Sequence, residues 1–285
     1  MMPRPPSSHL WVVILAGGDG TRLMPLMARL GCPGAPKQFC PIIPPRSMFQ
    51  QALGRAERIV PRHRLLTVIT RSHRSWALPQ LRPLWPENVL IQPENRDTAP
   101  GMLLPAMVIA NRDPQATIAF LPSDHFIREE ARFLDHVREA AALADASPDR
   151  LILLGMTPEG PETDYGWIEP GERLGSRDDP SLFSIRRFRE KPDAATATAL
   201  FAAGRLWNSF VLIGKVRQLL HLFRSHLPEL YHRFAEQGDR LGRSLPEGDL
   251  DRLYRGLPRI NVSRDLLTKV PDRLAVLRVS GILWS

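Results

Sequence analysis

A short apolar run that ends in a glycine-rich loop is the feature of this sequence that most restricts its fold. The run Trp11 to Leu15 is rich in β-branched residues and predicts a buried strand. It leads directly into Ala16-Gly17-Gly18-Asp19-Gly20-Thr21-Arg22-Leu23. Glycines after a strand let backbone N–H groups approach a phosphate without a Cβ in the way, and a helix that begins there favours anions at its N-terminus. The segment therefore predicts a phosphate-binding loop, or a tight turn that binds nothing.

The rest of the first half alternates between strand and helix patterns. Buried strands are expected over 65–70, 89–92, 117–121 and 151–155, and helices over 72–81, 98–111 and 128–144. This order predicts an α/β fold: a Rossmann-like, mostly parallel sheet flanked by helices on both faces. After residue 155 the pattern changes, with strands expected over 165–169 and 183–189 and helices over 194–203, 216–224, 228–237 and 249–255.

No internal repeat or low-complexity linker divides the 285 residues, so one domain is expected over 11–285. Residues 1–10, rich in proline and serine, are expected to be a disordered leader. Trp11 to Ala16 is the longest apolar run and is too short to span a bilayer, which favours a cytoplasmic protein. Cys32 and Cys40 lack further ligands at metal-binding spacing and are expected to be reduced thiols.

The net charge of +8 raises the alternative of a nucleic-acid-binding module. The basic residues are spread along the chain, however, without a run of five or a zinc-finger spacing. A diffuse positive charge fits anionic small molecules as substrates, and equally a basic surface without function. Neither nucleic acid nor a membrane is therefore the expected partner.

The two common phosphate-loop patterns do not fit. A Walker A loop needs lysine where Arg22 stands, and a dinucleotide fingerprint that begins at Gly18 needs glycine where Leu23 stands. The loop is followed instead by Pro25-Leu26 and by Pro36-Lys37-Gln38-Phe39. This combination resembles the opening pattern of the nucleoside-diphosphate-sugar pyrophosphorylases, and most of all the mannose-1-phosphate guanylyltransferases.

The resemblance implies a nucleotide-diphospho-sugar transferase fold, with a nucleotide-binding part over 11–155 and a sugar-phosphate-binding part over 156–285. Segment 93–100, Pro-Glu-Asn-Arg-Asp-Thr-Ala-Pro, is similar to the family segment beside the nucleotide, with Asp97 where asparagine is usual; Asp97 or Thr98 would also cap a helix. The implied nucleotide-binding residues are Leu15, Ala16, Gly17, Gly18, Gly20, Thr21, Asn95, Arg96, Thr98, Ala99 and Ser123.

The implied catalytic residues are three cations, Arg22, Lys37 and Lys191, which would offset the negative charge of the phosphates. Asp124 ends an expected buried strand, where doubly wound sheets bind ligands, and the family has its metal ligand at this aspartate. A lone carboxylate near phosphates suits Mg²⁺, the expected cofactor. His125 is interpreted as a packed neighbour rather than a base.

Three later segments resemble the family's sugar-binding motifs: Pro161 to Gly166, Phe188 to Pro192 and Trp207 to Phe210. The implied sugar-phosphate-binding residues are Tyr165, Gly166, Glu190 and Asn208. Asp164 and Phe210 stand where the family has glycine. The Phe210 ring either narrows the sugar pocket or points into the core.

The tail resembles the family more weakly, with Ser263-Arg264-Asp265 and with Thr268 where the family has an acidic residue before lysine. Trp284-Ser285 resembles the start of a family motif whose next residue is the second metal-binding aspartate, so a truncated chain or an incomplete metal site is expected.

The activity implied is transfer of a nucleotidyl group from GTP to mannose 1-phosphate, giving GDP-mannose and pyrophosphate. The substrates are a nucleoside triphosphate and a sugar 1-phosphate, and a homodimer is left open. A glucose-1-phosphate uridylyl- or thymidylyltransferase, and a non-catalytic paralogue that binds nucleotide sugars, are the alternatives.

Overall fold

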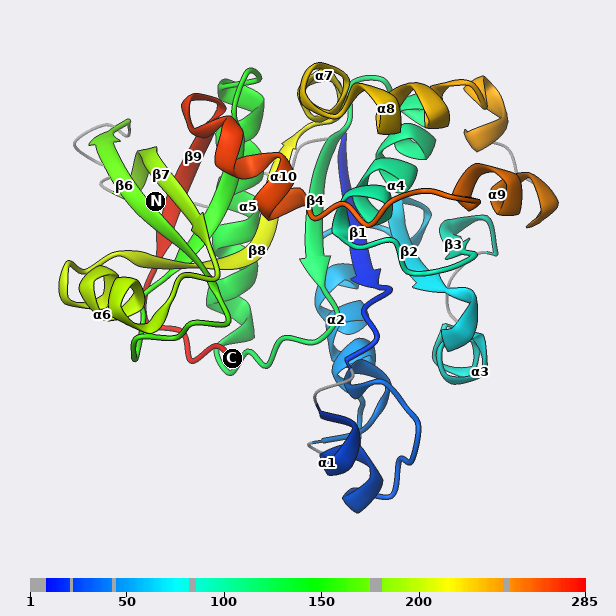
Figure 1. Ribbon diagram of the computed structural model, residues 1–285, viewed down its shortest axis with the longest axis horizontal. Coiled ribbons are helices and arrows are strands. Elements are labelled where there is room, and N and C mark those ends of the chain that lie inside the picture. The colour runs from blue at the N-terminus through cyan, green and yellow to red at the C-terminus, as the bar shows by residue number, and fades with distance from the viewer. Residues whose placement is uncertain (1–8, 21–22, 43–44, 82–85, 175–180, 243–246) are drawn as a thin grey trace.

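The computed structural model describes residues 9–20, 23–42, 45–81, 86–174, 181–242 and 247–285. In these ranges the chain forms one nine-stranded sheet in the order β3-β2-β1-β4-β8-β5-β9-β7-β6, with β8 also paired to β6 (Figure 1). The strands are β1 Leu10–Ala16, β2 Leu65–Thr70, β3 Val89–Gln92, β4 Thr117–Pro122, β5 Leu151–Met156, β6 Gly166–Arg173, β7 Leu182–Glu190, β8 Leu206–Lys215 and β9 Leu274–Val279.

The sheet is mixed, and the expectation of a mostly parallel sheet is wrong for its second half. Strands β1 to β4 are parallel to one another. Strand β8 then runs antiparallel to both β4 and β5, and β6 and β7 pair in antiparallel fashion. The physical reason is that β8 enters the sheet between two strands that precede it in the chain, a return that strand–helix alternation does not reveal.

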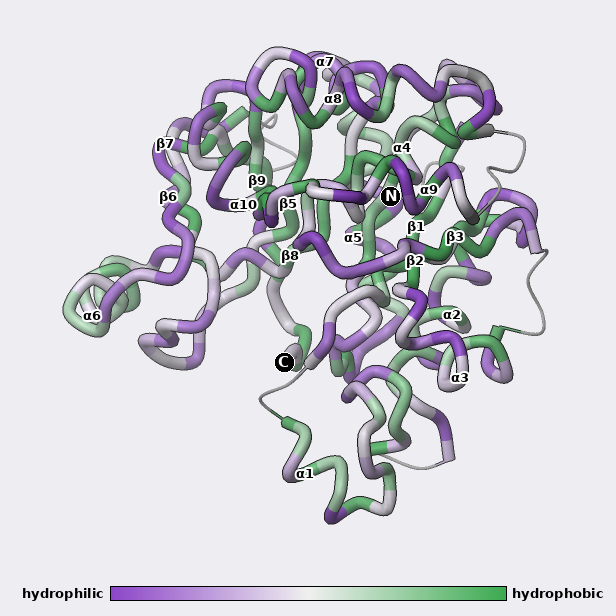
Figure 2. The backbone as a smooth tube through the Cα atoms, turned by 45° about the vertical axis from the view of Figure 1, so that its right-hand side comes forward, coloured by the Kyte–Doolittle hydropathy of each residue, from purple (hydrophilic) through white to green (hydrophobic). Residues whose placement is uncertain are grey.

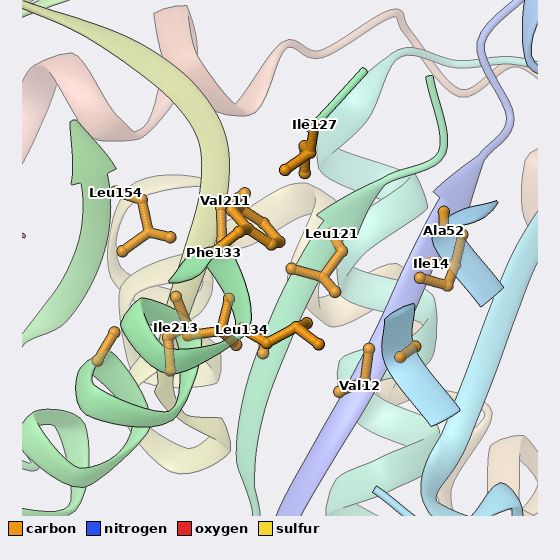
Figure 3. Packing of buried hydrophobic residues seen from close by; sticks show 14 of the residues in the cluster. Val12, Ile14, Ala52, Leu121, Ile127, Phe133, Leu134, Leu154, Val211 and Ile213 are labelled. Atoms are coloured by element: carbon orange, nitrogen blue, oxygen red, sulfur yellow. The ribbon is translucent and has the colours of Figure 1, made fainter. Parts of the chain in front are cut away.

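Helices cover both faces of this sheet. Buried residues of α2 Met48–Glu57, α5 Glu130–Ala146 and α6 Ala194–Ala202 share one core cluster with alternate residues of β1. Figure 3 shows Val12 and Ile14 of β1 near Leu121 of β4 and the α5 residues Phe133 and Leu134. The other face carries α4 Thr98–Arg112, α7 Val216–His226, α8 Pro228–Ala235, α9 Glu247–Tyr254 and α10 Val262–Asp265.

The hydropathy of the chain follows this layering. In Figure 2 strands β1, β2 and β3 are largely hydrophobic, whereas the edge strands β6 and β7 contain many hydrophilic residues. Alternate residues of β1 supply both clusters: Val12 and Ile14 pack on one face, and Trp11 and Val13 on the other. A strand that is buried on both faces reads as a continuous apolar run, which is why it was visible in the sequence.

The expected strands over 65–70 and 89–92 are confirmed residue for residue, and those over 117–121 and 151–155 to within one residue. The expected helix over 72–81 is only α3 Arg74–Ala77 between 3₁₀ turns, because Pro79 interrupts it. The expected leader is also too long: Leu10 is buried and pairs with Thr117 of β4, while residues 1–8 lie outside the described ranges. Helices α1 Met24–Arg29 and α2, and strands β8 and β9, were not expected.

Cys32 and Cys40 form a disulfide, so the expectation of two free thiols is wrong in this structure. The bridge closes the segment that holds Lys37, and the backbone N–H of Cys40 donates to the Lys37 carbonyl. Among the described residues, no helix combines the length and the apolar character needed to cross a membrane.

Candidate functional site

A cavity of about 310 Å³ lies at the carboxyl ends of β1, β3 and β4. This is the edge where ligands bind in open α/β sheets. Its lining brings together Leu15, Gly17, Gly18, Gly20, Lys37, Gln38, Val68, Gln92, Asn95, Asp97, Thr98, Gly101, Pro122, Ser123, Asp124, Phe210 and Arg259. Residues from five separate stretches of the first half of the chain therefore share one site with Phe210 and Arg259 of the second half.

The glycine loop is held by the side chain of Gln38. Its Nε2 donates to the Gly18 carbonyl at 2.8 Å and, more weakly, to the Ala16 carbonyl at 3.4 Å. Gly20 has φ 59, a left-handed conformation that glycine adopts without cost. A Cβ on Gly17 would lie 3.1 Å from Nε2 of Gln92. The conformation favours glycine at position 20 and the closeness of Gln92 favours it at position 17, whereas a Cβ on Gly18 would meet open space.

Lys37 and Asp124 meet in this cavity from different elements. The ammonium of Lys37, on a 3₁₀ turn over Lys37–Phe39, lies 2.7 Å from Oδ2 of Asp124, which follows β4. Burial raises the pKa of Asp124, but His125 and Lys37 lower it by more, so the carboxyl has a pKa below its ordinary value. The side chains are 29% and 33% exposed, so an anionic ligand can reach both.

His125 is a packed neutral side chain, as expected. Burial lowers its pKa to about 4, against the raising effect of Asp124. The indole N–H of Trp284 donates to its Nδ1 at 3.2 Å, and the two rings form an edge contact. With Nδ1 already accepting a hydrogen bond, His125 is poorly suited to take a proton from a substrate.

The segment that follows β3 is fixed by hydrogen bonds to a distant loop. Oγ1 of Thr98 accepts from the backbone N–H of Val262, and the Ala99 N–H donates to the Ile260 carbonyl. Asp97, with φ 70, caps α4 by accepting from the Thr98 N–H, and its Oδ1 also accepts from Asn261 Nδ2. The predicted cap at Asp97 is therefore confirmed.

Asn95 links this segment to the glycine loop, because its Nδ2 donates to Asp19 at 2.9 Å. Arg96 instead pairs with Glu94 at 2.6 Å and does not line the cavity. Two other predicted nucleotide-binding residues, Ala16 and Ala99, are buried and do not line the cavity either. Thr21 and Arg22 lie outside the described residues.

The predicted sugar-phosphate residues form a second group beside the cavity. Gly166 pairs in register with Glu190, and a Cβ on Gly166 would lie 2.9 Å from Oε2 of Glu190 and 3.3 Å from Cβ of Asn208. Burial raises the pKa of Glu190, while Lys191 acts to lower it and Asp97 to raise it. Asn208 precedes Phe210, which lines the cavity, by two residues on β8, so this group lies beside the cavity.

Tyr165 lies in an aromatic cluster rather than in the lining of the cavity. Its ring packs against Trp207 and Trp284, with ring centroids 5.1 and 5.4 Å apart. The Trp284 segment itself pairs with the segment that follows Asp124, since Ser285 and Phe126 exchange backbone hydrogen bonds.

Eight lining residues were not among the predicted site residues: Gln38, Val68, Gln92, Asp97, Gly101, Pro122, Phe210 and Arg259. Gln92 had a signal in the sequence, because it ends an expected buried strand at the ligand-binding edge. Its amide is buried and fixed by Tyr254, whose hydroxyl donates to Oε1 at 2.9 Å. Phe210, whose orientation the sequence left open, lines the cavity and also packs against the core cluster of α4.

The site can accommodate a magnesium ion only with the help of a ligand. Among the described residues, no three histidine, cysteine, aspartate or glutamate side chains converge on one point. The partly exposed carboxylate of Asp124 fits an ion that takes few protein ligands and completes its shell with phosphate oxygens and water.

The glycine loop, the adjacent lysine–aspartate pair and the mixed sheet together define an α/β protein with a polar cavity at the carboxyl ends of its strands. The family model described as nucleotidyl transferase matches residues 11–244. The chain belongs to this nucleotidyl transferase family.

Curated relatives narrow the comparison. The chain is 35% identical over 274 residues to the xanthan biosynthesis protein XanB of Xanthomonas campestris, covering 94% of this chain and 56% of the relative. It is 32% identical over 228 residues to a mannose-1-phosphate guanylyltransferase of Escherichia coli, covering 78% of this chain and 46% of the relative. The chain thus spans about half the length of the curated relatives it matches.

Among solved structures, a Thermus thermophilus protein described as a mannose-1-phosphate geranyltransferase has a TM-score of 0.82 at 27% identity, covering 97% of this chain and 76% of that one. A Helicobacter pylori protein described as a mannose-6-phosphate isomerase has a TM-score of 0.74 at 19% identity, covering 97% and 99%. The second likeness concerns the fold alone.

Proposed function

We propose that this protein transfers a guanylyl group from GTP to mannose 1-phosphate, releasing pyrophosphate and GDP-mannose. The observation that carries the proposal is the meeting of Lys37 and Asp124 beside the glycine loop, 2.7 Å apart, in a chain of the nucleotidyl transferase family. Relatives from Escherichia coli that are named mannose-1-phosphate guanylyltransferase support mannose 1-phosphate and a guanylyl donor. A cytoplasmic location is part of the proposal.

In this reaction a phosphate oxygen of the sugar phosphate forms a bond to the α-phosphorus, and the bond from that phosphorus to the pyrophosphate oxygen breaks. The nucleophile is already an anion, so no base is needed, which fits the occupied Nδ1 of His125. Catalysis then depends on position and on neutralisation of charge. The backbone of residues 17–20 would hold the triphosphate, and Lys37, with Arg22, would offset its charge.

On the sugar side, Glu190 would accept from sugar hydroxyls and Lys191 would bind the sugar phosphate. The raised pKa of Glu190 shows that its carboxylate is partly desolvated, so a hydroxyl donor would be bound firmly there. Asn208 would donate through its amide nitrogen, since its Oδ1 already accepts from the Phe210 N–H.

Asp124 would hold Mg²⁺ together with phosphate oxygens. When bound, the ion would supply positive charge to the phosphoryl oxygens at the reacting centre.

The test is release of pyrophosphate with Mg²⁺ and every pairing of GTP, UTP, dTTP and ATP with mannose 1-phosphate and glucose 1-phosphate. We expect GTP with mannose 1-phosphate to give at least tenfold more product than any other pairing. Equal or greater turnover with UTP or dTTP would reject the guanylyl assignment in favour of a uridylyl- or thymidylyltransferase.

The same assay tests a second candidate, a protein that binds nucleotide sugars without turnover. The bulky Phe210 in the cavity favours this candidate, because the related motif has glycine there. Stabilisation of the protein by GDP-mannose without pyrophosphate release under any pairing would support it.

A further inference from the structure

The glycine loop carries a negative charge between two of its glycines. Asp19 stands between Gly18 and Gly20, and both of these glycines line the cavity. A carboxylate has the same sign of charge as a triphosphate, so the two repel each other when they lie close together. A loop that presents its N–H groups to phosphate therefore binds it well only when the Asp19 carboxylate is directed elsewhere.

In the structure this carboxylate lies against two other segments instead of lining the cavity. Oδ2 of Asp19 accepts a hydrogen bond of 2.9 Å from Nδ2 of Asn95, in the segment that follows β3. Oδ1 lies 3.5 Å from Nε2 of His73, in the 3₁₀ turn that follows β2. Each oxygen of the carboxylate therefore has its own nitrogen partner, and the two partners come from the ends of different strands.

The amide of Asn95 is oriented by a second hydrogen bond. Its Oδ1 accepts from the backbone N–H of Asp97 at 2.9 Å. Since only the nitrogen end of the amide can donate, the nitrogen must face Asp19. Asp97 is itself fixed as the cap of α4 and by Asn261, so the donor to Asp19 is held from the rest of the fold.

His73 is held more tightly than a surface histidine would be. It is 4% exposed, its ring makes an edge contact with Phe39 at 5.6 Å between centroids, and its Nδ1 lies 3.4 Å from the Ala16 carbonyl. Burial lowers the pKa of His73, while the Ala16 carbonyl and Asp19 act to raise it. The ring thus contacts the chain both just before the glycine loop and within it.

We propose that His73 and Asn95 are positioning residues that hold the Asp19 carboxylate out of the cavity, so that the glycine loop offers N–H groups without a negative charge to the triphosphate. The inference rests on the proposed function, since it concerns the nucleotide of that same site. Loss of either partner would leave the carboxylate free to turn toward the phosphates and repel them.

The test measures dissociation constants for GTP and for inorganic triphosphate by calorimetry, together with KM and kcat for GTP. We expect His73→Phe, which keeps an aromatic ring against Phe39, to weaken binding of both anions about tenfold, as one charge moved close to the phosphates would. KM should rise in proportion, while kcat should change less than about twofold. Asn95→Ala, the second variant, should act in the same direction, and added salt should reduce both losses because it screens exposed charges.

Removal of the charge itself distinguishes positioning from mere structural support. The double variant His73→Phe/Asp19→Asn should bind inorganic triphosphate within about threefold of Asp19→Asn alone. A purely structural role of His73 predicts no such rescue, because asparagine at position 19 restores no packing. Phe49→Leu is the matched control: Phe49 is buried, and its ring contacts the same Phe39 ring at 5.2 Å. This variant should lower stability without changing the affinity for inorganic triphosphate.

The outcomes separate the inference from the proposed function. Affinities of His73→Phe and Asn95→Ala within about twofold of the wild type, or a loss that Asp19→Asn does not rescue, would overturn the inference and leave the proposed function intact. If the wild type binds inorganic triphosphate but releases no pyrophosphate with any pairing of substrates, the proposed function fails, and the rescue still tests the inference by binding. A wild type that binds neither GTP nor inorganic triphosphate would overturn both.

Discussion

Removal of one buried hydroxyl, by Tyr254→Phe, should both destabilise the fold and weaken nucleotide binding. Tyr254 is fully buried on α9, and its hydroxyl donates to Oε1 of Gln92, which is 4% exposed. Burial raises the pKa of Tyr254, so the hydroxyl remains a donor at every working pH. The two residues are 162 positions apart in the chain, and their hydrogen bond joins α9 to the ligand-binding edge of the sheet.

The size of the effect follows from the burial of the acceptor. Without the hydroxyl, Oε1 of Gln92 is left buried without its donor, which costs roughly 1–3 kcal/mol. For a chain of 285 residues that corresponds to a fall of roughly 2–5 °C in Tm. Gln92 also loses the contact that fixes which end of its amide faces Gly17. The KM for the nucleotide should therefore rise about threefold to tenfold, which corresponds to a loss of roughly 0.7–1.4 kcal/mol of binding free energy.

Urea unfolding and thermal melting measure the first effect, and initial rates at varied nucleotide concentration measure the second. Tyr231→Phe is the control, because the Tyr231 hydroxyl makes no hydrogen bond within the described residues. A double-mutant cycle with Gln92→Leu should give a coupling energy of about 1–2 kcal/mol. Unfolding free energies of Tyr254→Phe and wild type that agree within about 0.3 kcal/mol would show that this hydrogen bond does not stabilise the fold.

Two further predictions concern the cation and the histidine beside Asp124. Lys37→Gln should lower kcat/KM by at least 100-fold, which corresponds to about 3 kcal/mol of transition-state stabilisation. Lys269→Gln, a control at an exposed lysine, should change kcat/KM less than twofold. Equal effects of the two substitutions in steady-state kinetics would contradict the role assigned to Lys37. His125 has a pKa of about 4 in the folded protein, below its unfolded value, so the folded state binds fewer protons between about pH 4 and 6.5. Stability should therefore be full above about pH 6.5 and fall by about 3 kcal/mol toward pH 4, which urea titrations at each pH would measure. His125→Asn should reduce this loss, and an unchanged pH dependence in that variant would show that other groups cause it.

The sequence predicts the first half of the fold well, because its strands are short apolar runs that can be recognised without knowledge of the rest of the chain. Strands such as Leu65–Thr70 are apolar runs buried on both faces, and they are bounded by polar or helical segments. Strand β8 lacked that signal, because Asn208, Ser209 and Gly214 interrupt its apolar pattern. These polar residues face the site or form hydrogen bonds within the irregular part of β8. The residues that contribute to the site therefore also obscure the strand pattern in the sequence.

The residues of the candidate site also divide into those with a local sequence signal and those without one. Lys37, Asp124 and the glycines were found because they belong to short motifs, and the structure brings them together. The closeness of Tyr254 to Gln92 depends on contacts between residues far apart in the chain, for which a single sequence has no signal. The left-handed conformation of Phe210 was equally hidden, since nothing in a phenylalanine side chain favours it.

In the proposed reaction, residues 17–20, Lys37 and Asp124 bind the triphosphate of a nucleotide for transfer. A crystal structure with mannose 1-phosphate, Mg²⁺ and a GTP analogue that cannot release pyrophosphate would test this directly. We expect phosphate oxygens within hydrogen-bonding distance of the backbone N–H groups of 17–20 and of the Lys37 ammonium, with the ion on Asp124. A nucleotide bound elsewhere, with the contact between Lys37 and Asp124 unchanged, would contradict it.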